Sequence, residues 1–274
     1  CHNCDDHKPS YCFDFYPRNL AGKRADGSAT VSAKGEDLNA LFFCQSSFAT
    51  YAIARGVNTV VVDKTLPLDI LGPLGCGIQT GAGAAVNSLG IKTGESLVIF
   101  GGGAVGLSAL LGARAVGAGT VIVVEPNAGR GKLALELGAT HHINPKETAD
   151  VLAKIKELCG GVNYALDTTG IPAVIAAGVE ALLPNGMLGL LGVPSSPEAT
   201  VPANMMSMLI RGIGVKYIVE GDADPQEFIP RMAGWFKAGK FPFDKLVKKF
   251  PFEQINEAAA ASLSGEVIKP VVVF

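Results

Sequence analysis

Apolar runs of strand length alternate with helical patterns in the long middle part of the chain, from Ser96 onward. Leu97–Phe100 is apolar without a break, as expected of a strand buried on both faces, and Val121–Val124 repeats this pattern. Leucines recur between the two runs at i, i+3 and i+4, namely Leu107, Leu110 and Leu111. They predict a helix that ends near Gly117 and Gly119.

The strand and helix unit is predicted to repeat. Further strands are expected at 141–144, 164–166 and 187–193. Three further helices are expected between the strands. The first ends at Gly138, and the third stops at the sequence Pro184-Asn185-Gly186. The second has one apolar face, formed by Val151, Leu152, Ile155 and Leu158. Such alternation is typical of an α/β fold with a doubly wound parallel sheet, covered by helices on both faces.

The segments before and after this middle part have a different pattern of apolar and polar residues. Phe48–Ile53 alternates apolar and polar positions, and Val60–Val62 is β-branched throughout, which indicates antiparallel β structure. After residue 220 the chain becomes polar and rich in proline, which suggests a return to the first domain. We therefore expect a doubly wound domain with parts of an antiparallel β domain on either side of it.

Composition and charge exclude several classes of protein. A length of 274 residues allows two domains, and 48% hydrophobic residues with 34 glycines exclude a disordered chain. The net charge of −2 comes from scattered charges, so we expect no nucleic acid as partner. Repeated glycines between Leu97 and Val124, where Arg114 is the one charge, favour a buried βαβ unit over a membrane span.

A glycine-rich turn follows the first buried strand. Gly101, Gly103 and Gly106 match G-x-G-x-x-G, in which the glycines permit a tight turn, close approach of a pyrophosphate, and packing of the helix on the strand. The helix N-terminus offers free N–H groups to the phosphates. Glu125 ends the next strand, where a carboxylate would bind both ribose hydroxyls and repel a 2′-phosphate. The pattern predicts NAD as cofactor; a glycine-rich turn with an incidental glutamate is the alternative.

Arg130 follows at the start of the next predicted helix. It could lie along the same ribose edge, or it could be an exposed arginine without a role in binding.

Three of the six cysteines lie in the first twelve residues. Cys1, Cys4 and Cys12 provide three thiolates in a short loop, and a structural zinc needs four ligands. His7 could be the fourth, or a cysteine could precede the chain; surface thiols or one disulfide are the other interpretations. The uneven distribution favours metal binding in a reducing cytoplasm over a disulfide framework. Because the chain begins with Cys1 and not methionine, we expect its true start to lie upstream.

This spacing resembles the structural-zinc lobe of the zinc-dependent medium-chain alcohol dehydrogenases, whose pattern is C-x2-C-x2-C-x7-C. Cys1, Cys4 and Cys12 correspond to its second, third and fourth cysteines. The resemblance implies a first ligand three residues upstream of position 1, and no metal-binding role for His7.

A second segment with the same resemblance is Leu74–Gly81, which is similar to the family's G-C-G-x-x-T-G sequence. It implies that Cys76 is the third protein ligand of a catalytic zinc and that Thr80 lies beside the nicotinamide. Without the resemblance, Cys76 would be interpreted as a small buried residue. The other two ligands in this family, a cysteine and the histidine of Gly-His-Glu, precede the lobe and do not occur in this sequence. We therefore expect an incomplete, N-terminally truncated enzyme.

The similarity extends from Cys1 to Phe274 and, through segments such as Glu220–Asp222 and Phe252–Glu257, favours the aryl-alcohol (benzyl alcohol) branch. It implies cofactor contacts for three further residues: Val105 behind the nicotinamide, Val193, and Lys269 at the pyrophosphate. Other residues are expected to be structural or non-catalytic, namely Cys44, Cys159, His141, His142, Phe241 and Phe243.

The resemblance implies three segments: a remnant of a GroES-like catalytic domain at 1–77, a Rossmann domain that binds NAD at 78–219, and a return to the catalytic domain at 220–274. The implied reaction is hydride transfer between a primary alcohol, of aromatic benzyl type, and NAD, with Zn²⁺ as Lewis acid. Relatives are dimers or tetramers, so we expect a cytoplasmic homo-oligomer acting on a small alcohol or aldehyde. The alternatives are another alcohol substrate, a zinc-free quinone reductase, against which the cysteines argue, and an NAD-binding fragment without turnover.

Overall fold

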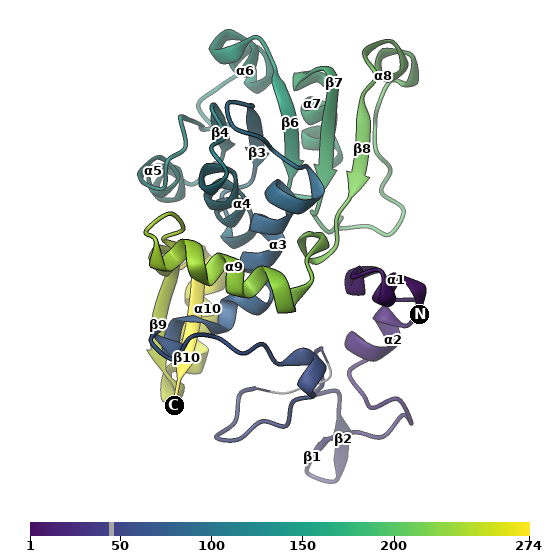
Figure 1. Ribbon diagram of the computed structural model, residues 1–274, viewed down its shortest axis with the longest axis vertical. Coiled ribbons are helices and arrows are strands. Elements are labelled where there is room, and N and C mark those ends of the chain that lie inside the picture. The colour runs from purple at the N-terminus through teal and green to yellow at the C-terminus, as the bar shows by residue number, and fades with distance from the viewer. Residues whose placement is uncertain (44–46) are drawn as a thin grey trace.

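The computed structural model describes residues 1–43 and 47–274, and its centre is a parallel sheet of six strands (Figure 1). The order across the sheet is β5-β4-β3-β6-β7-β8, and all five pairings are parallel. The strands are β3 (Leu97–Phe100), β4 (Val121–Val124), β5 (His141–Ile143), β6 (Val162–Asp167), β7 (Leu182–Leu190) and β8 (Gly214–Tyr217). The order in which successive strands are added reverses between β3 and β6, which confirms the doubly wound arrangement predicted from the sequence.

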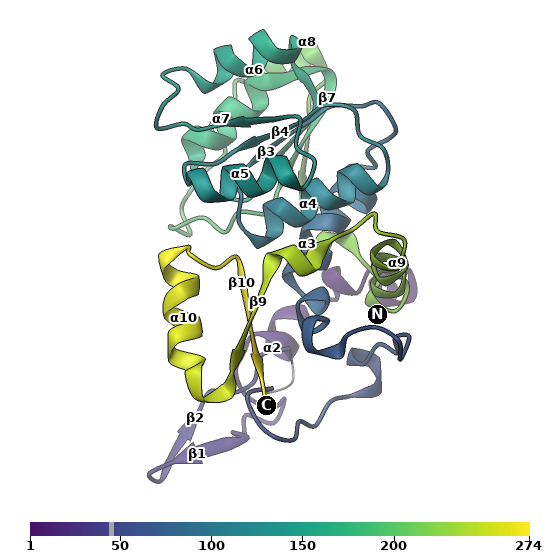
Figure 2. The same ribbon diagram turned by 90° about the vertical axis from the view of Figure 1, so that its left-hand side faces the viewer.

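Two hydrophobic cores cover the faces of this sheet. Side chains of a strand alternate between faces, so Leu97 and Ile99 enter one core while Val98 and Phe100 enter the other. The first core is completed by α4 (Ala104–Ala115) and α5 (Ala128–Glu136), and the second by α6 (Val151–Cys159), α7 (Pro172–Ala181) and α8 (Met205–Arg211). Figure 2 shows these two groups of helices on opposite sides of the sheet.

The helix α3 (Gly77–Gly83) connects this sheet domain to the remaining segments. It continues into one π-helical turn, Ala84–Ser88, and its buried residues belong to the first core. A methyl group added at Gly112 of α4 would lie 2.9 Å from the Ala82 backbone, so the two helices approach closely because a glycine stands at their contact. Helix α9 (Pro225–Lys237) packs against the same region through Phe228, Ile229 and Met232.

The remaining elements lie below the sheet domain in Figure 1 and are short. The N-terminal part holds α1 (His2–Asp5), α2 (Phe15–Asn19) and an antiparallel hairpin of β1 (Val31–Ala33) and β2 (Glu36–Leu38). The C-terminal part holds a parallel pair of β9 (Val247–Pro251) and β10 (Lys269–Val273), with α10 (Ile255–Ser264) between them in sequence. Single 3-10 turns complete the described chain at Pro9–Tyr11, Gly56–Asn58, Leu68–Ile70, Gly72–Gly75, Glu220–Asp222, Phe243–Leu246 and Phe252–Gln254.

The prediction of antiparallel strands at Phe48–Ile53 and Val60–Val62 is wrong. Neither run is a strand, and Tyr51 and Ile53 are 90% and 94% exposed. An apolar alternation forms a strand only when a neighbouring strand satisfies its backbone and covers one face. No such neighbour is present among the described residues, so the pattern alone does not produce a strand.

The predicted end of the helix at Pro184-Asn185-Gly186 is also wrong. Helix α7 ends at Ala181, and β7 already begins at Leu182, which pairs with Val162. The next partners are Tyr164 and Met187, so the residues between Leu182 and Met187 form an irregularity inside the strand. Asn185 takes a positive φ of 62° there. A turn sequence thus marks a bulge in a strand and not the end of a helix.

Two other predictions concern apolar residues. The stretch from Leu97 to Val124 forms β3, α4 and β4, and no described helix is both long and apolar enough to cross a membrane. Phe241 and Phe243 are fully buried beside Trp235 and Phe236, so their expected role in the core is confirmed.

Candidate dinucleotide and metal site

The glycine-rich turn joins β3 to α4 with the geometry that its glycines permit. Gly101 takes a φ of 101°, which an L residue rarely adopts. A methyl group added at Gly106 would overlap the Gly101 carbonyl oxygen, whereas one at Gly103 would meet no atom within 4 Å. Gly101 and Gly106 therefore allow a tight turn under the helix, and Gly103 leaves open space in front of the α4 N-terminus.

Glu125 lies immediately after β4 and is 4% exposed. Its Oε2 atom accepts a hydrogen bond from the Gly102 N–H at 2.6 Å, and its Oε1 atom accepts one from the Asn127 N–H at 2.8 Å. The carboxylate is thus held against the glycine-rich turn, where a carboxylate that binds ribose hydroxyls would stand. Each carboxylate oxygen retains capacity for a further hydrogen bond.

Arg130 extends from the first turn of α5 toward the segment between α10 and β10. A methyl group added at Gly265 would lie 2.8 Å from an Arg130 guanidinium nitrogen, and both residues line a cavity of about 370 Å³. The Arg130 Nε atom is buried and has no hydrogen-bond partner in the described part of the chain. Arg130 is therefore packed against the Gly265 segment and is not a free surface side chain.

The carboxyl ends of β3, β4, β6 and β7 meet at one edge of the sheet, where the loops of the site lie. Val193 follows β7 in an exposed loop, with 87% of its surface accessible. A methyl group added at Gly192 would overlap the Gly170 backbone, so the loops after β6 and β7 touch. In open α/β sheets, ligands bind in this crevice next to the reversal of strand order.

The helix α3 places Cys76 next to the glycine-rich turn. A methyl group at Gly81 would overlap the Val105 carbonyl oxygen, so α3 packs directly on the start of α4. A methyl group added at Gly77 would lie 3.8 Å from Lys269 Nζ and 4.0 Å from Val105 Cγ2. Three predicted site residues from distant parts of the sequence, Cys76, Val105 and Lys269, therefore lie in one neighbourhood.

Glu220 is a residue of this neighbourhood that the sequence did not identify as functional. Its Oε2 atom accepts from Thr80 Oγ1 at 3.2 Å and from Gln79 Nε2 at 3.4 Å, and its Oε1 atom lies 4.0 Å from Cys76 Sγ. The Thr80 hydroxyl also lies 2.9 Å from the Cys76 carbonyl oxygen, so its single proton has two possible acceptors. Glu220 is 140 residues from Thr80 in sequence, and no local pattern joins the two.

The surroundings of Cys76 determine its ionisation. Partial desolvation raises the pKa of the Cys76 thiol, the Glu220 carboxylate raises this pKa further, and the positive charge of Lys269 opposes both. A bound cation would favour the thiolate in such a place. Among the described residues, no group of three metal-binding side chains includes Cys76. A catalytic zinc site needs three ligands from the protein, and Cys76 is the one predicted ligand that lies in this neighbourhood.

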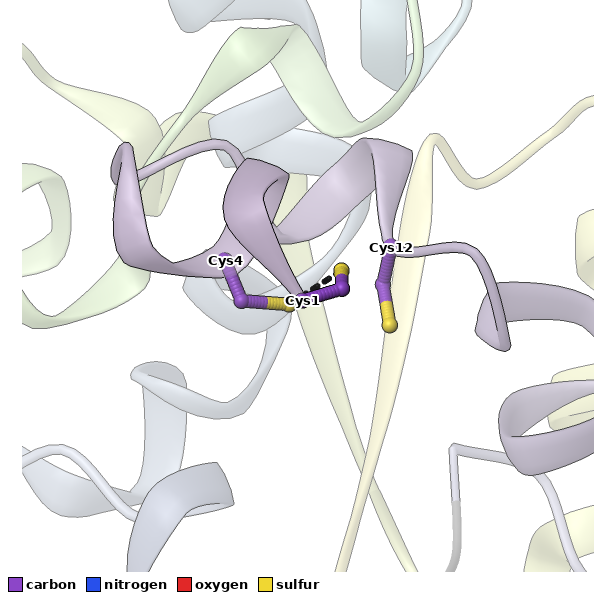
Figure 3. A group of neighbouring side chains, drawn as sticks. All are labelled: Cys1, Cys4 and Cys12. Atoms are coloured by element: carbon purple, nitrogen blue, oxygen red, sulfur yellow. Dashed lines mark hydrogen bonds between the residues drawn. The ribbon is translucent and has the colours of Figure 1, made fainter.

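The thiols of Cys1, Cys4 and Cys12 converge at the N-terminus (Figure 3). Their sulfur atoms all lie within 4.8 Å of one another, with Cys1 and Cys4 3.6 Å apart, and none of the three forms a disulfide. Tetrahedral zinc with bonds of about 2.3 Å needs sulfur atoms roughly 3.8 Å apart. The donor chemistry and the spacing both suit a structural zinc ion, with one ligand outside this group.

His7 is not part of the thiol group. Its Nδ1 atom lies 2.9 Å from Asp224 Oδ2, and this hydrogen bond with Asp224 raises the His7 pKa. The geometry favours the interpretation in which His7 is not a zinc ligand.

The other cysteines and histidines make structural contacts. Cys159 Sγ lies 3.3 Å from the Ile155 carbonyl oxygen, and His141 lies 3.0 Å from the Thr140 hydroxyl. The His142 Nε2 atom is 2.8 Å from the Glu125 carbonyl oxygen, below α5. Cys44 lies outside the described residues.

Comparison with known proteins connects these sites. Residues 104–237 match the sequence model of a protein family described as "Zinc-binding dehydrogenase". The chain is 54% identical to geraniol dehydrogenase from Castellaniella defragrans over 276 aligned positions, which cover 100% of this chain and 74% of that protein. The chain belongs to the zinc-dependent medium-chain alcohol dehydrogenase family. The cofactors of this family are Zn²⁺ and NAD.

Solved structures show the same similarity for this alcohol dehydrogenase. An alcohol dehydrogenase zinc-binding domain protein from Burkholderia ambifaria is 49% identical with a TM-score of 0.95, and benzyl alcohol dehydrogenase from Acinetobacter calcoaceticus is 44% identical with a TM-score of 0.92. Each comparison covers 99% of this chain and 74% of the other. The fold is thus shared with enzymes of alcohol oxidoreduction over nearly all of the sequence.

Proposed function

We propose that this alcohol dehydrogenase transfers hydride between a primary alcohol of benzyl type and NAD, with zinc as Lewis acid. The contact between the Cys76 region and the glycine-rich turn carries the proposal. Gly77 lies beside Val105, so a metal at Cys76 and a dinucleotide at the turn would be neighbours. Hydride transfer requires such proximity between the cofactor and the reacting carbon. When bound, zinc polarises the alcohol oxygen, and NAD accepts the hydride.

The residues of the chain have separate tasks in this proposal. The open space at Gly103 and the α4 N-terminus receive the pyrophosphate, to which Lys269 brings a positive charge. Glu125 binds the adenosine ribose, and the Arg130 guanidinium, which lines the adjacent cavity, contacts the same part of the cofactor. Cys76 is one zinc ligand, while Thr80, Val105 and Val193 contact the nicotinamide. The domain limits at 77 and 219 would separate the catalytic segments from the cofactor domain.

The substrate class rests on two relatives. Benzyl alcohol dehydrogenase is 44% identical to this chain and geraniol dehydrogenase is 54% identical. Benzyl alcohol and geraniol are both primary alcohols with an unsaturated carbon next to the reacting carbon. Geraniol oxidation is therefore the second candidate function, supported by the higher identity.

Steady-state kinetics with benzyl alcohol, geraniol and ethanol test the proposal on a protein that also carries the two zinc ligands predicted upstream of Cys1. We expect NAD reduction with kcat/KM for benzyl alcohol at least about tenfold above that for ethanol, which corresponds to roughly 1.4 kcal/mol of differential transition-state binding. A higher kcat/KM for geraniol than for benzyl alcohol would change the assigned substrate to geraniol, while the proposed hydride transfer to NAD would stand. Absence of zinc from the purified active protein would contradict the mechanism. Binding of NAD without turnover would support the alternative of a cofactor-binding fragment.

We also propose a homo-oligomer, a homodimer or homotetramer, in a reducing cytoplasm. Strand β8 pairs only with β7 among the described strands, and the adjacent α8 exposes Met205, Leu209 and Ile210 at 85%, 76% and 76%. An uncovered strand edge beside an apolar helix suits association with a second copy. Light scattering tests the mass in solution. The unpaired thiols of the Cys1 group support the reducing compartment.

A further inference from the structure

The Glu220 carboxylate is a fixed negative charge at the start of α3. Two donors, Thr80 Oγ1 at 3.2 Å and Gln79 Nε2 at 3.4 Å, hold its Oε2 atom. Among the described residues, no hydroxyl or amide donor holds the Oε1 atom, which points toward Cys76 Sγ, 4.0 Å away. The charge is therefore directed at the place where Cys76, Val105 and Lys269 meet.

The loop that carries Glu220 is anchored on both sides. Asp222 forms an ion pair with Lys216 at 2.5 Å and accepts from the Tyr11 hydroxyl at 2.6 Å. The Gly221 carbonyl oxygen accepts from Asn87 Nδ2 at 3.3 Å. Glu220 itself takes a φ of 51°, a left-handed conformation that costs free energy for a residue other than glycine. The structure thus places a carboxylate where the backbone alone would favour glycine.

The order of the strands locates Glu220 along the cofactor crevice. Glu125 directly follows β4, on one side of the reversal of strand order between β3 and β6, and the proposed function places the adenosine there. A dinucleotide that crosses the reversal brings its nicotinamide to the side of β6, β7 and β8. Glu220 follows β8 by three residues and lies beside Cys76, so it stands at the nicotinamide half of the crevice.

We propose that Glu220 shifts the binding preference of the site toward oxidised NAD⁺ relative to NADH. The nicotinamide ring carries a positive charge in NAD⁺ and none in NADH, so a nearby carboxylate attracts the oxidised form selectively. The neutral donors Thr80 and Gln79 hold this carboxylate without cancelling its charge, and the positive charge of Lys269 near Gly77 partly opposes it. The consequence is tighter binding of the cofactor that oxidises alcohol, with little effect on the affinity for the reduced product. The inference rests on the proposed NAD-dependent function.

Dissociation constants of NAD⁺ and NADH for the Glu220→Gln variant test this inference. We expect the affinity for NAD⁺ to fall about tenfold while that for NADH changes less than about twofold. A tenfold change in the ratio lowers the preference for the oxidised form by about 30 mV in the potential of the bound couple. The control is Glu157→Gln, an exposed carboxylate on α6 that pairs with Lys154, and it should change neither constant.

A second variant, Glu220→Gly, removes the charge and also suits the positive φ, so it should fold even where Glu220→Gln does not. It should shift the same ratio in the same direction. An equal loss of affinity for NAD⁺ and NADH in both variants would show that Glu220 only orders the loop, and would overturn the inference. Failure of the unmodified protein to bind either cofactor would instead overturn the proposed function itself.

Discussion

Gly83 in α3 lies directly against Gly221, so that a methyl group added at Gly83 would stand 2.5 Å from the Gly221 carbonyl oxygen. The backbone cannot yield easily there, because the Gly221 loop is tied to Lys216 and Tyr11 through Asp222. We predict that Gly83→Ala lowers the free energy of unfolding by about 1–3 kcal/mol, the range for overpacking. Chemical denaturation measures the change.

Gly234→Ala in α9 is the matched control for this substitution. Gly234 is exposed, helical and without any atom within 4 Å of an added methyl group. Alanine there should be neutral or stabilise by up to about 1 kcal/mol. Equal destabilisation by the two substitutions would show that the Gly83 contact with Gly221 is not restrictive.

Removal of one thiol from the Cys1, Cys4 and Cys12 group should release metal. We predict that Cys4→Ser loses one equivalent of zinc per chain, because a structural site with too few ligands binds weakly, and that the melting temperature falls with it. Elemental analysis after purification measures the zinc content. Cys159→Ser changes a thiol at the end of α6 that packs against the second core and lies 3.3 Å from the Ile155 carbonyl oxygen, and this variant should retain all zinc. Retention of zinc by Cys4→Ser would refute the structural site.

Substitution of Glu125 should weaken the discrimination between the two dinucleotides. In Glu125→Gln the side chain keeps its size and its oxygen can still accept from the Gly102 N–H, but its NH₂ group cannot accept from the Asn127 N–H, and the charge that repels a 2′-phosphate is lost. We expect the affinity for NADH to fall about tenfold and the ratio of NADH to NADPH affinity to fall further, as measured by nucleotide fluorescence. The control is Glu136→Gln, which changes an exposed carboxylate at the end of α5 and should leave the affinities for NADH and NADPH unchanged. An unchanged ratio in Glu125→Gln would remove Glu125 from the cofactor site.

The contact between His7 and Asp224 predicts a dependence of stability on pH. The hydrogen bond with Asp224 raises the His7 pKa above its ordinary value of about 6.5, so folding favours the protonated form. The contribution is complete below that value and is lost as the pH rises through the folded-state pKa. His7→Gln should therefore lower the melting temperature slightly at pH 5.5 and have no such effect at pH 9.

His141→Gln is the control, since the His141 ring forms its hydrogen bond with the neutral Thr140 hydroxyl and not with a carboxylate. Its effect on the melting temperature should be the same at both pH values. A His7→Gln effect that grows with pH would have the wrong sign for this contact.

Local patterns in the sequence were sufficient for the doubly wound domain. The strands Leu97–Phe100 and Val121–Val124 are apolar throughout because both faces are buried, and the G-x-G-x-x-G turn between strand and helix needs no distant partner. A strand that is buried on both faces is a continuous apolar run, which can be recognised from the sequence alone. The spacing of Cys1, Cys4 and Cys12 is equally local, and the thiols do converge.

Long-range packing decided the features that these patterns missed. Phe48–Ile53 has the alternation of a strand but no described neighbour to pair with, and β7 passes through Pro184 because Leu182 and Met187 both find partners in β6. Glu220 reaches Thr80 and Cys76 across more than a hundred residues. A strand needs a partner and a site needs side chains from separate elements, so both depend on contacts that only the folded chain creates.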